Sequence, residues 1–122
     1  MKFLLDANFL MAVGQFKVDI FTQLRGFGKP EFYTLDSVVK ELKKIEGWGG
    51  KDGRHAKLAL MLIEKKGVEI LKSRDVHTDR ELNRLARMGY TVCTQDKELI
   101  NGLITKGIEV YRIIRGSIVA KA

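Results

Sequence analysis

Short apolar segments alternate with helical segments along this chain, and this alternation limits the folds that it can adopt. Segments typical of buried strands occupy residues 3–5, 31–35, 68–71, 90–94 and 108–114. Apolar residues spaced three and four apart predict helices over residues 7–13, 18–25, 36–47, 53–66, 78–89 and 96–107. Strands alternating with helices imply parallel crossovers, so we expect an α/β fold, a three-layer α/β/α sandwich. With 122 residues and no internal repeat, we expect a single domain, 1–122.

Four acidic residues stand close to the ends of predicted strands. Asp6 ends the first strand, and Asp96 follows the fourth strand by two residues. Asp79 opens the helix that leads into the fourth strand, and Glu41 lies one turn into the helix after the second. In doubly wound sheets, ligands bind outside the carboxyl ends of the strands, where the winding reverses. We therefore expect these four side chains to converge at one end of the sheet.

Each of these acids also has a purely structural interpretation. Asp6 and Asp96 can act as helix N-caps, worth about 1 kcal/mol each. Asp79 lies in residues 78–81, which match a capping box, and an acid in a first helical turn suits the helix dipole. Glu41 can be an ordinary surface acid. The expected convergence of all four at one place favours a binding site.

Clustered carboxylates repel one another and need a compensating cation. Oxygen ligands of this kind favour Mg²⁺ or Mn²⁺. His55 and His77 have no His or Cys partner at ligand spacing, so we do not expect a zinc site. Cys93 is the only cysteine, and its position between Val92 and Thr94 on a central strand predicts a place in the core.

The rest of the chain is strongly basic. The whole chain has 22 Lys and Arg against 15 Asp and Glu, a net charge of +7, so the part outside the four acids has 11 acidic residues against the 22 basic ones. An acidic pocket on a basic surface suits phosphodiester hydrolysis, because the surface attracts the phosphate backbone and a divalent cation activates water. Basic residues are concentrated around the glycine-rich residues 47–53, at Lys29, Lys40, Lys43, Lys44, Lys51, Arg54 and Lys57.

The glycine-rich residues 47–53 are expected to form the most flexible loop of the chain. We expect Lys51, Arg54 and Lys57 to bind RNA, and Trp48 to stack on an unpaired base. The alternative for this segment is a solvated turn, with Trp48 folded back onto the neighbouring helices.

Four segments resemble, in order, the motifs of PIN-domain ribonucleases. Residues 4–10 (LLDANFL) resemble the opening motif, and residues 37–42 (SVVKEL) the second. Residues 78–82 (TDREL) resemble the third motif, and residues 92–99 (VCTQDKEL) the fourth. Residues 50–60 (GKDGRHAKLAL) are similar to the archaeal branch related to small-subunit rRNA-processing PIN proteins, with VapC-type toxins as more distant relatives.

The resemblance implies a PIN-like fold with five parallel strands in the order 3-2-1-4-5. It implies that the catalytic acids, which also bind the metal Mg²⁺ or Mn²⁺, are Asp6, Glu41, Asp79 and Asp96. Asn8 and Thr94 would support these acids by hydrogen bonding.

Two positions depart from the family pattern. Ala7 stands where Thr is common, outside the set of acids. Arg80 stands where a second acid is frequent, which leaves open whether one metal ion binds or two. Glu98 is near enough in the sequence to substitute for that acid.

The implied function is that of a metal-dependent endoribonuclease that hydrolyses phosphodiester bonds of single-stranded or looped RNA, in the maturation of rRNA or other RNA. Two alternatives stay open: a non-cleaving RNA-binding ribosome-assembly factor with the same fold, and a VapC-type toxin ribonuclease. Homodimerisation and a ribosome-assembly or antitoxin protein partner also stay open. Haloacid-dehalogenase phosphatases fit less well, because they need a second Asp where Asn8 stands. Response-regulator receivers also fit less well, since the early acidic pair of that fold is absent.

Nothing in the sequence predicts a membrane protein. The longest apolar run, residues 58–63, is far shorter than the roughly 20 residues that span a bilayer. Asp6 interrupts the N-terminal apolar run, so we expect no signal peptide. A single cysteine fits a reducing compartment, and we expect a cytoplasmic location.

Overall fold

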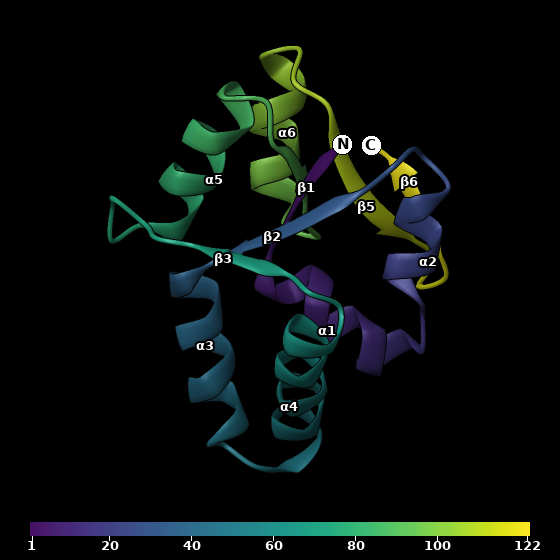
Figure 1. The fold of residues 1–122 in the computed structure, drawn as a ribbon, viewed down its shortest axis with the longest axis vertical. Helices are drawn as coiled ribbons and strands as arrows, with labels where there is room; N and C mark the ends of the chain where they lie inside the picture. Colours follow the sequence, from purple (N-terminus) through teal and green to yellow (C-terminus); the bar gives the residue numbers. More distant parts are fainter.

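A six-stranded sheet forms the centre of the molecule in the computed structural model, which describes residues 1–122 (Figure 1). The strands are β1 (Lys2–Leu5), β2 (Glu31–Leu35), β3 (Glu69–Leu71), β4 (Thr91–Cys93), β5 (Val110–Ile114) and β6 (Ile118–Lys121). Their order across the sheet is β3-β2-β1-β4-β5-β6. All neighbours are parallel except β5 and β6. The predicted order 3-2-1-4-5 is therefore confirmed for the parallel part.

Helices cover both faces of this sheet. They are α1 (Ala7–Phe16), α2 (Ile20–Arg25), α3 (Asp36–Glu46), α4 (Gly50–Lys65), α5 (Thr78–Arg87) and α6 (Lys97–Thr105). In Figure 1, α5 and α6 lie on one side of the sheet, and α1, α3 and α4 lie on the other. The expected three-layer α/β/α arrangement is thus confirmed. No helix has both the length and the apolar character that crossing a membrane requires.

The central position of β1 follows from its composition. Its residues Phe3, Leu4 and Leu5 have no exposed surface, as expected for a parallel strand covered on both faces. Leu5 is paired with Cys93 of β4, which is also fully buried, as predicted. The chain leaves β1 toward β2 and leaves β4 toward β5, so the winding reverses between these neighbours. Because of this register, the residues after Leu5 and Cys93 emerge side by side at the same edge of the sheet.

The sixth strand was not predicted, since the sequence analysis ended the sheet at residue 114. The chain reverses through Arg115 and Gly116, whose φ angles are 55° and 67°. The Ser117 N–H donates to the Ile114 carbonyl over 3.1 Å and closes this turn. Turns with two successive positive φ angles usually contain Asn, Asp or Gly, so Arg115 conceals the hairpin in the sequence.

The glycine-rich segment is shorter as a loop than predicted. Helix α4 begins at Gly50 rather than residue 53, so only residues 47–49 connect α3 to α4. Gly49 and Gly50 have φ angles of 71° and 65°, which other residues adopt only with strain. Gly49, the N-cap, and Gly50, the first residue of α4, therefore form a tight turn where the helix begins, and the loop expected over residues 47–53 is limited to residues 47–49.

The capping box predicted over residues 78–81 is also absent. His77 precedes the helix, and Thr78 is already its first residue. The Thr78 hydroxyl donates to the Ser37 Oγ over 3.1 Å. The Glu81 carboxylate accepts the Arg74 N–H over 2.9 Å and pairs with Arg84. Thr78 and Glu81 therefore bond to other residues instead of forming the two reciprocal hydrogen bonds of a capping box.

Candidate active site

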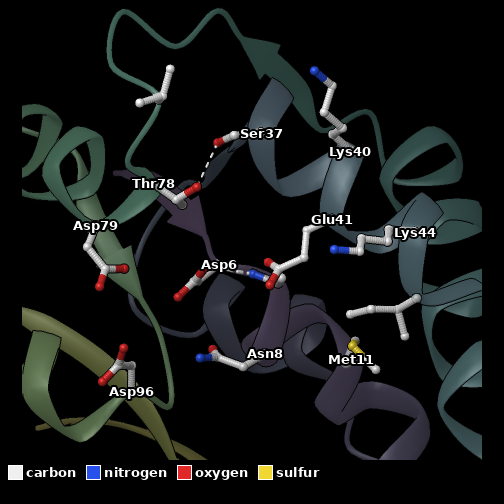
Figure 2. A pocket seen from close by; sticks show the side chains of 13 residues that line it. Asp6, Asn8, Met11, Ser37, Lys40, Glu41, Lys44, Thr78, Asp79 and Asp96 are labelled. Atoms are coloured by element: carbon white, nitrogen blue, oxygen red, sulfur yellow. Dashed lines mark hydrogen bonds between the residues drawn. The ribbon is translucent and has the colours of Figure 1, made fainter.

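An acidic cavity of about 590 Å³ opens at the carboxyl ends of the central strands. The four acids singled out in the sequence all line it: Asp6, Glu41, Asp79 and Asp96. Figure 2 shows their side chains approaching the same space from different elements of the fold. The other lining residues are Ala7, Asn8, Met11, Ser37, Lys40, Lys44, Ile45, Val76 and Thr78. The four acids therefore converge, as expected, at the point where the winding of the sheet reverses.

Asp6 lies on the floor of the cavity, only 7% exposed. Its N–H donates to the Cys93 carbonyl over 3.0 Å, which extends the pairing of β1 with β4. It also caps α1, because its Oδ1 accepts the Ala7 N–H over 2.8 Å. Its Oδ2 accepts the hydroxyl proton of Thr94 over 2.7 Å. The capping role and a place in the acidic cavity therefore coexist in one side chain.

Thr94 and Asn8 join the ends of β1 and β4. Thr94 is fully buried, and its Oγ1 donates to Asp6 and accepts the Asp96 N–H over 3.2 Å. The Asn8 Oδ1 accepts the Gln95 N–H over 2.9 Å. Both residues predicted to support the acids thus hold the segments that carry Asp6 and Asp96 next to each other.

Asp96 caps α6, as the sequence predicted. Its Oδ1 accepts the N–H groups of Glu98 and Leu99 over 3.0 and 3.4 Å. Its Oδ2 accepts no hydrogen bond from the protein and remains available to a ligand in the cavity. Glu98, the suggested substitute acid, does not line the cavity.

The acids disturb one another electrostatically. Burial raises the pKa of Asp6 to about 6, the hydrogen bonds from Thr94 and Ala7 lower it, and the charges of Glu41 and Asp79 raise it. Burial raises the pKa of Asp79 as well, and the charges of Asp96 and Glu98 add to this rise. The pKa values of Asp6 and Asp79 are therefore raised mainly by burial, and repulsion between the acids adds a smaller contribution.

Two lysines that the sequence grouped with the basic residues around the glycine-rich segment line this cavity instead. Lys40 and Lys44 lie on α3, like Glu41, and both line the cavity. Residues three and four apart share a helix face, so the position of Glu41 was a sufficient signal for Lys44. Neither lysine Nζ lies within 4.0 Å of a carboxylate oxygen, since the three ion pairs of the chain involve other residues.

The residues predicted to bind RNA lie away from the acids. Trp48 is 64% exposed in the connection between α3 and α4 and is not folded back onto the helices. Lys51, Arg54 and Lys57 are exposed on α4, and Arg54 lines a separate hollow between α1 and α4. None of these four residues lines the acidic cavity.

The donor chemistry of the cavity suits a hydrated hard cation. It offers carboxylate, amide and hydroxyl oxygens and no thiolate or imidazole ligand, and its only sulfur is the thioether of Met11. No three His, Cys, Asp or Glu side chains lie close enough together to hold one ion in common. Mg²⁺ keeps several of its waters and binds proteins through one or two carboxylates, so an open set of acids around a cavity fits it. Mn²⁺ accepts the same oxygen ligands.

Comparison with known proteins shows which family the chain belongs to. The sequence profile of the PIN-like domain family matches residues 3–116, so the chain belongs to that family. The resemblance noted in the sequence is thereby confirmed.

Among solved structures, the fold is similar to that of the PIN domain endonuclease Utp24. The TM-score is 0.78 and the identity 23%, over 98% of this chain and 90% of that one. It is also similar to a domain of a functionally unknown protein from Methanocaldococcus jannaschii DSM 2661. Here the TM-score is 0.57 and the identity 17%, over 93% and 91% of the chains. These identities establish a shared fold. No curated protein is significantly similar in sequence.

Proposed function

We propose that the protein is a Mg²⁺- or Mn²⁺-dependent endoribonuclease that hydrolyses phosphodiester bonds during the maturation of rRNA or another RNA. The observation that carries this proposal is the convergence of four carboxylates, from four separate segments, on one cavity. Membership of the PIN-like family supports a nuclease, because domains of this family generally cleave nucleic acids. The similarity in fold to Utp24, a PIN domain endonuclease, agrees with it.

In this proposal the metal-binding acids are Asp6, Glu41, Asp79 and Asp96. When bound, the divalent cation supplies an activated water and neutralises charge on the phosphate. Thr94 holds the Asp6 carboxylate through its hydroxyl proton and fixes the backbone of Asp96 through its oxygen. Asn8 fixes the start of the segment that carries Asp96. These contacts hold the acids in place before the substrate arrives.

RNA is the substrate that the charge distribution favours. The net charge is +7 although the cavity itself is acidic, so positive charge covers other parts of the molecule. Such a surface binds a phosphate backbone through the release of counterions. The backbone is thereby brought to the acids, which on their own would repel it.

The proposal is tested by cleavage of a labelled RNA with Mg²⁺, with Mn²⁺ and with EDTA. We expect cleavage with either metal ion and none with EDTA. Asp6→Asn should lower the rate by at least about 100-fold, the upper end of the loss seen when residues that only orient metal ligands are changed. Asp52→Asn is the matched control, because it removes the same charge from an exposed position on α4, outside the cavity.

Two outcomes contradict the proposal in different ways. Equal cleavage by the wild type and Asp6→Asn would mean that the observed activity does not come from this cavity. Binding of RNA by the wild type without any metal-dependent cleavage would favour the alternative of a non-cleaving RNA-binding assembly factor.

A further inference from the structure

Two lysines face the acidic cavity without an acidic partner. Lys40 and Lys44 are one turn apart on α3, and both are exposed and line the cavity. Figure 2 shows Lys44 extending from α3 beside Glu41, and Lys40 nearer the start of the same helix, at the edge of the cavity, with its side chain extending away from the acids. No carboxylate oxygen lies within 4.0 Å of either ammonium group. Both cations are therefore available to a ligand although acids lie nearby.

The charge balance of the cavity indicates a role for these lysines in binding phosphate. Four ionised carboxylates and one divalent cation leave two negative charges uncompensated, and such a cavity repels a phosphodiester. Lys40 and Lys44 supply two positive charges at the same place. A lysine ammonium is a compact point charge that binds phosphate oxygens well. With both lysines, the cavity holding its metal ion can accept an anionic backbone.

The cavity continues into a second hollow of about 340 Å³. The two hollows share the lining residues Ser37, Lys40 and Val76, so they adjoin along the start of α3. Arg74 lines the second hollow, is exposed, and forms no ion pair. Lys44, Lys40 and Arg74 thus mark a line of free cations that leads out of the acidic cavity.

The acids of the second hollow are engaged by their own neighbours. Asp36 accepts hydrogen bonds from the N–H groups of Ser73 and Ser37, over 2.9 and 2.8 Å. Asp75 accepts the His77 N–H over 2.9 Å and lies 3.7 Å from Arg80. Neither acid lies within 4.0 Å of the Lys40 or Arg74 cation, although the charge of Lys40 contributes to lowering the pKa of Asp36.

We propose that Lys44 and Lys40 bind the RNA backbone phosphates next to the phosphate that is cleaved, and that Arg74 binds the one beyond them. The RNA strand then leaves the acidic cavity across the start of α3, toward the segment between β3 and α5. This inference rests on the proposed function and deepens it by assigning the path of the substrate.

Lys43 provides a matched control on the same helix. It is as exposed as Lys44 but faces a different hollow, between α3, α4 and β3, which the apolar residues Val39, Leu60 and Ile63 line. Replacing Lys43 by Ala removes the same charge from an adjacent position. Any difference between Lys43→Ala and Lys44→Ala therefore reports the location of the charge and not the net charge.

The experiment measures binding and cleavage of a 5′-labelled single-stranded RNA. Binding is followed by fluorescence anisotropy with Ca²⁺, a divalent cation that also takes oxygen ligands, over a range of salt concentrations, and cleavage by single-turnover kinetics with Mg²⁺. Lys44→Ala and Lys40→Ala should each weaken binding about 10-fold and reduce the slope of log K against log salt by about 0.7. Arg74→Ala should act in the same direction. Lys43→Ala should leave both quantities unchanged. Lys44→Arg keeps the positive charge and should retain binding, so a loss of binding in Lys44→Ala would come from the missing charge and not from a loss of structure.

The outcomes separate this inference from the proposed function. If the wild type binds and cleaves RNA but Lys44→Ala and Lys40→Ala behave like Lys43→Ala in both assays, the phosphate path is wrong and the nuclease proposal stands. If the wild type neither binds nor cleaves RNA, the proposed function is wrong and the phosphate path falls with it.

Discussion

At Asp6, burial by the fold disfavours the ionised carboxyl, whereas binding of a cation in the acidic cavity requires it. Its carboxyl is 7% exposed, and its pKa rises from 3.8 to about 6, chiefly because of burial. A carboxyl that holds its proton more tightly in the folded than in the unfolded state loses stability when it ionises. The hydrogen bonds from Thr94 and Ala7 offset only part of this cost. Asp6 therefore destabilises the metal-free protein at neutral pH.

Asp6→Asn should accordingly stabilise the metal-free protein. The difference between the two pKa values corresponds to a gain of at most about 3 kcal/mol at pH 7. The wild type should lose this contribution as the pH rises from about 4 to about 6, whereas the variant, which has no proton to lose there, should not. Urea unfolding of both proteins in EDTA, between pH 4 and pH 7, measures the difference.

The comparison between variants is needed because other carboxylates give slopes of their own. Asp52→Asn, at an exposed position, should change the free energy of unfolding by less than about 0.5 kcal/mol at every pH. If the stability of Asp6→Asn exceeds that of the wild type by the same amount at pH 4 and pH 7, the burial argument for Asp6 is wrong.

Among the elements, those whose signals are local could be predicted from the sequence. The buried run of β1 and the caps at Asp6 and Asp96 depend only on nearby residues, and all three are where the pattern placed them. The order of the strands followed from the family resemblance and the rule on reversal of winding. Together these sufficed to bring the four acids to one cavity.

Features that depend on distant contacts could not be predicted. The turn at Arg115 requires positive φ in a residue that rarely adopts it, and the pairing with β5 is what stabilises it. Glu81 lies in the sequence pattern of a capping box, but its carboxylate accepts hydrogen bonds from the Arg74 N–H and the Arg84 guanidinium instead. Local preference decides an element only where no tertiary partner offers a better contact.

The packing of α1 against α4 depends on a small residue. A Cβ added at Gly14 would lie 2.7 Å from Cδ2 and 3.2 Å from Cγ of the His55 ring. Gly14→Ala should therefore destabilise the protein by about 1–3 kcal/mol, because the helices must separate or the ring must move. Chemical denaturation measures the change.

Gly102 in α6 is the control for this substitution. A Cβ there meets nothing within 4 Å, so Gly102→Ala should stabilise the protein by up to about 1 kcal/mol through helix propensity alone. Equal effects of the two substitutions would show that α1 and α4 can separate freely at Gly14.

At the scale of the whole molecule, the acids occupy one cavity while basic residues are spread over the outside. Lys51, Arg54 and Lys57 are exposed along α4, beyond the cavity that contains Lys40 and Lys44. A long RNA that reaches the acids can also run along α4. Because these three residues lie outside the acidic cavity, they take no part in the hydrolysis step. Charge on α4 is therefore expected to affect binding and not the rate of the bound complex.

Replacing Lys51, Arg54 and Lys57 together by Ala should weaken the binding of a long RNA. The slope of log K against log salt should fall by up to about 2, since each phosphate contact on a single strand contributes about 0.7. The maximal single-turnover rate with Mg²⁺ should not change, because none of the three residues lines the acidic cavity. Anisotropy titrations at several salt concentrations, together with cleavage kinetics at saturating protein, separate the two effects.

A second triple variant tests whether position or total charge is responsible. Arg25 and Lys29 lie before β2, and Lys106 follows α6, so all three are near the amino ends of the strands, opposite the cavity. Both triple variants lower the net charge from +7 to +4. If RNA follows α4, only the α4 variant loses salt dependence. If the two variants lose it equally, the basic surface attracts RNA through its overall field, and the strand has no fixed path on α4.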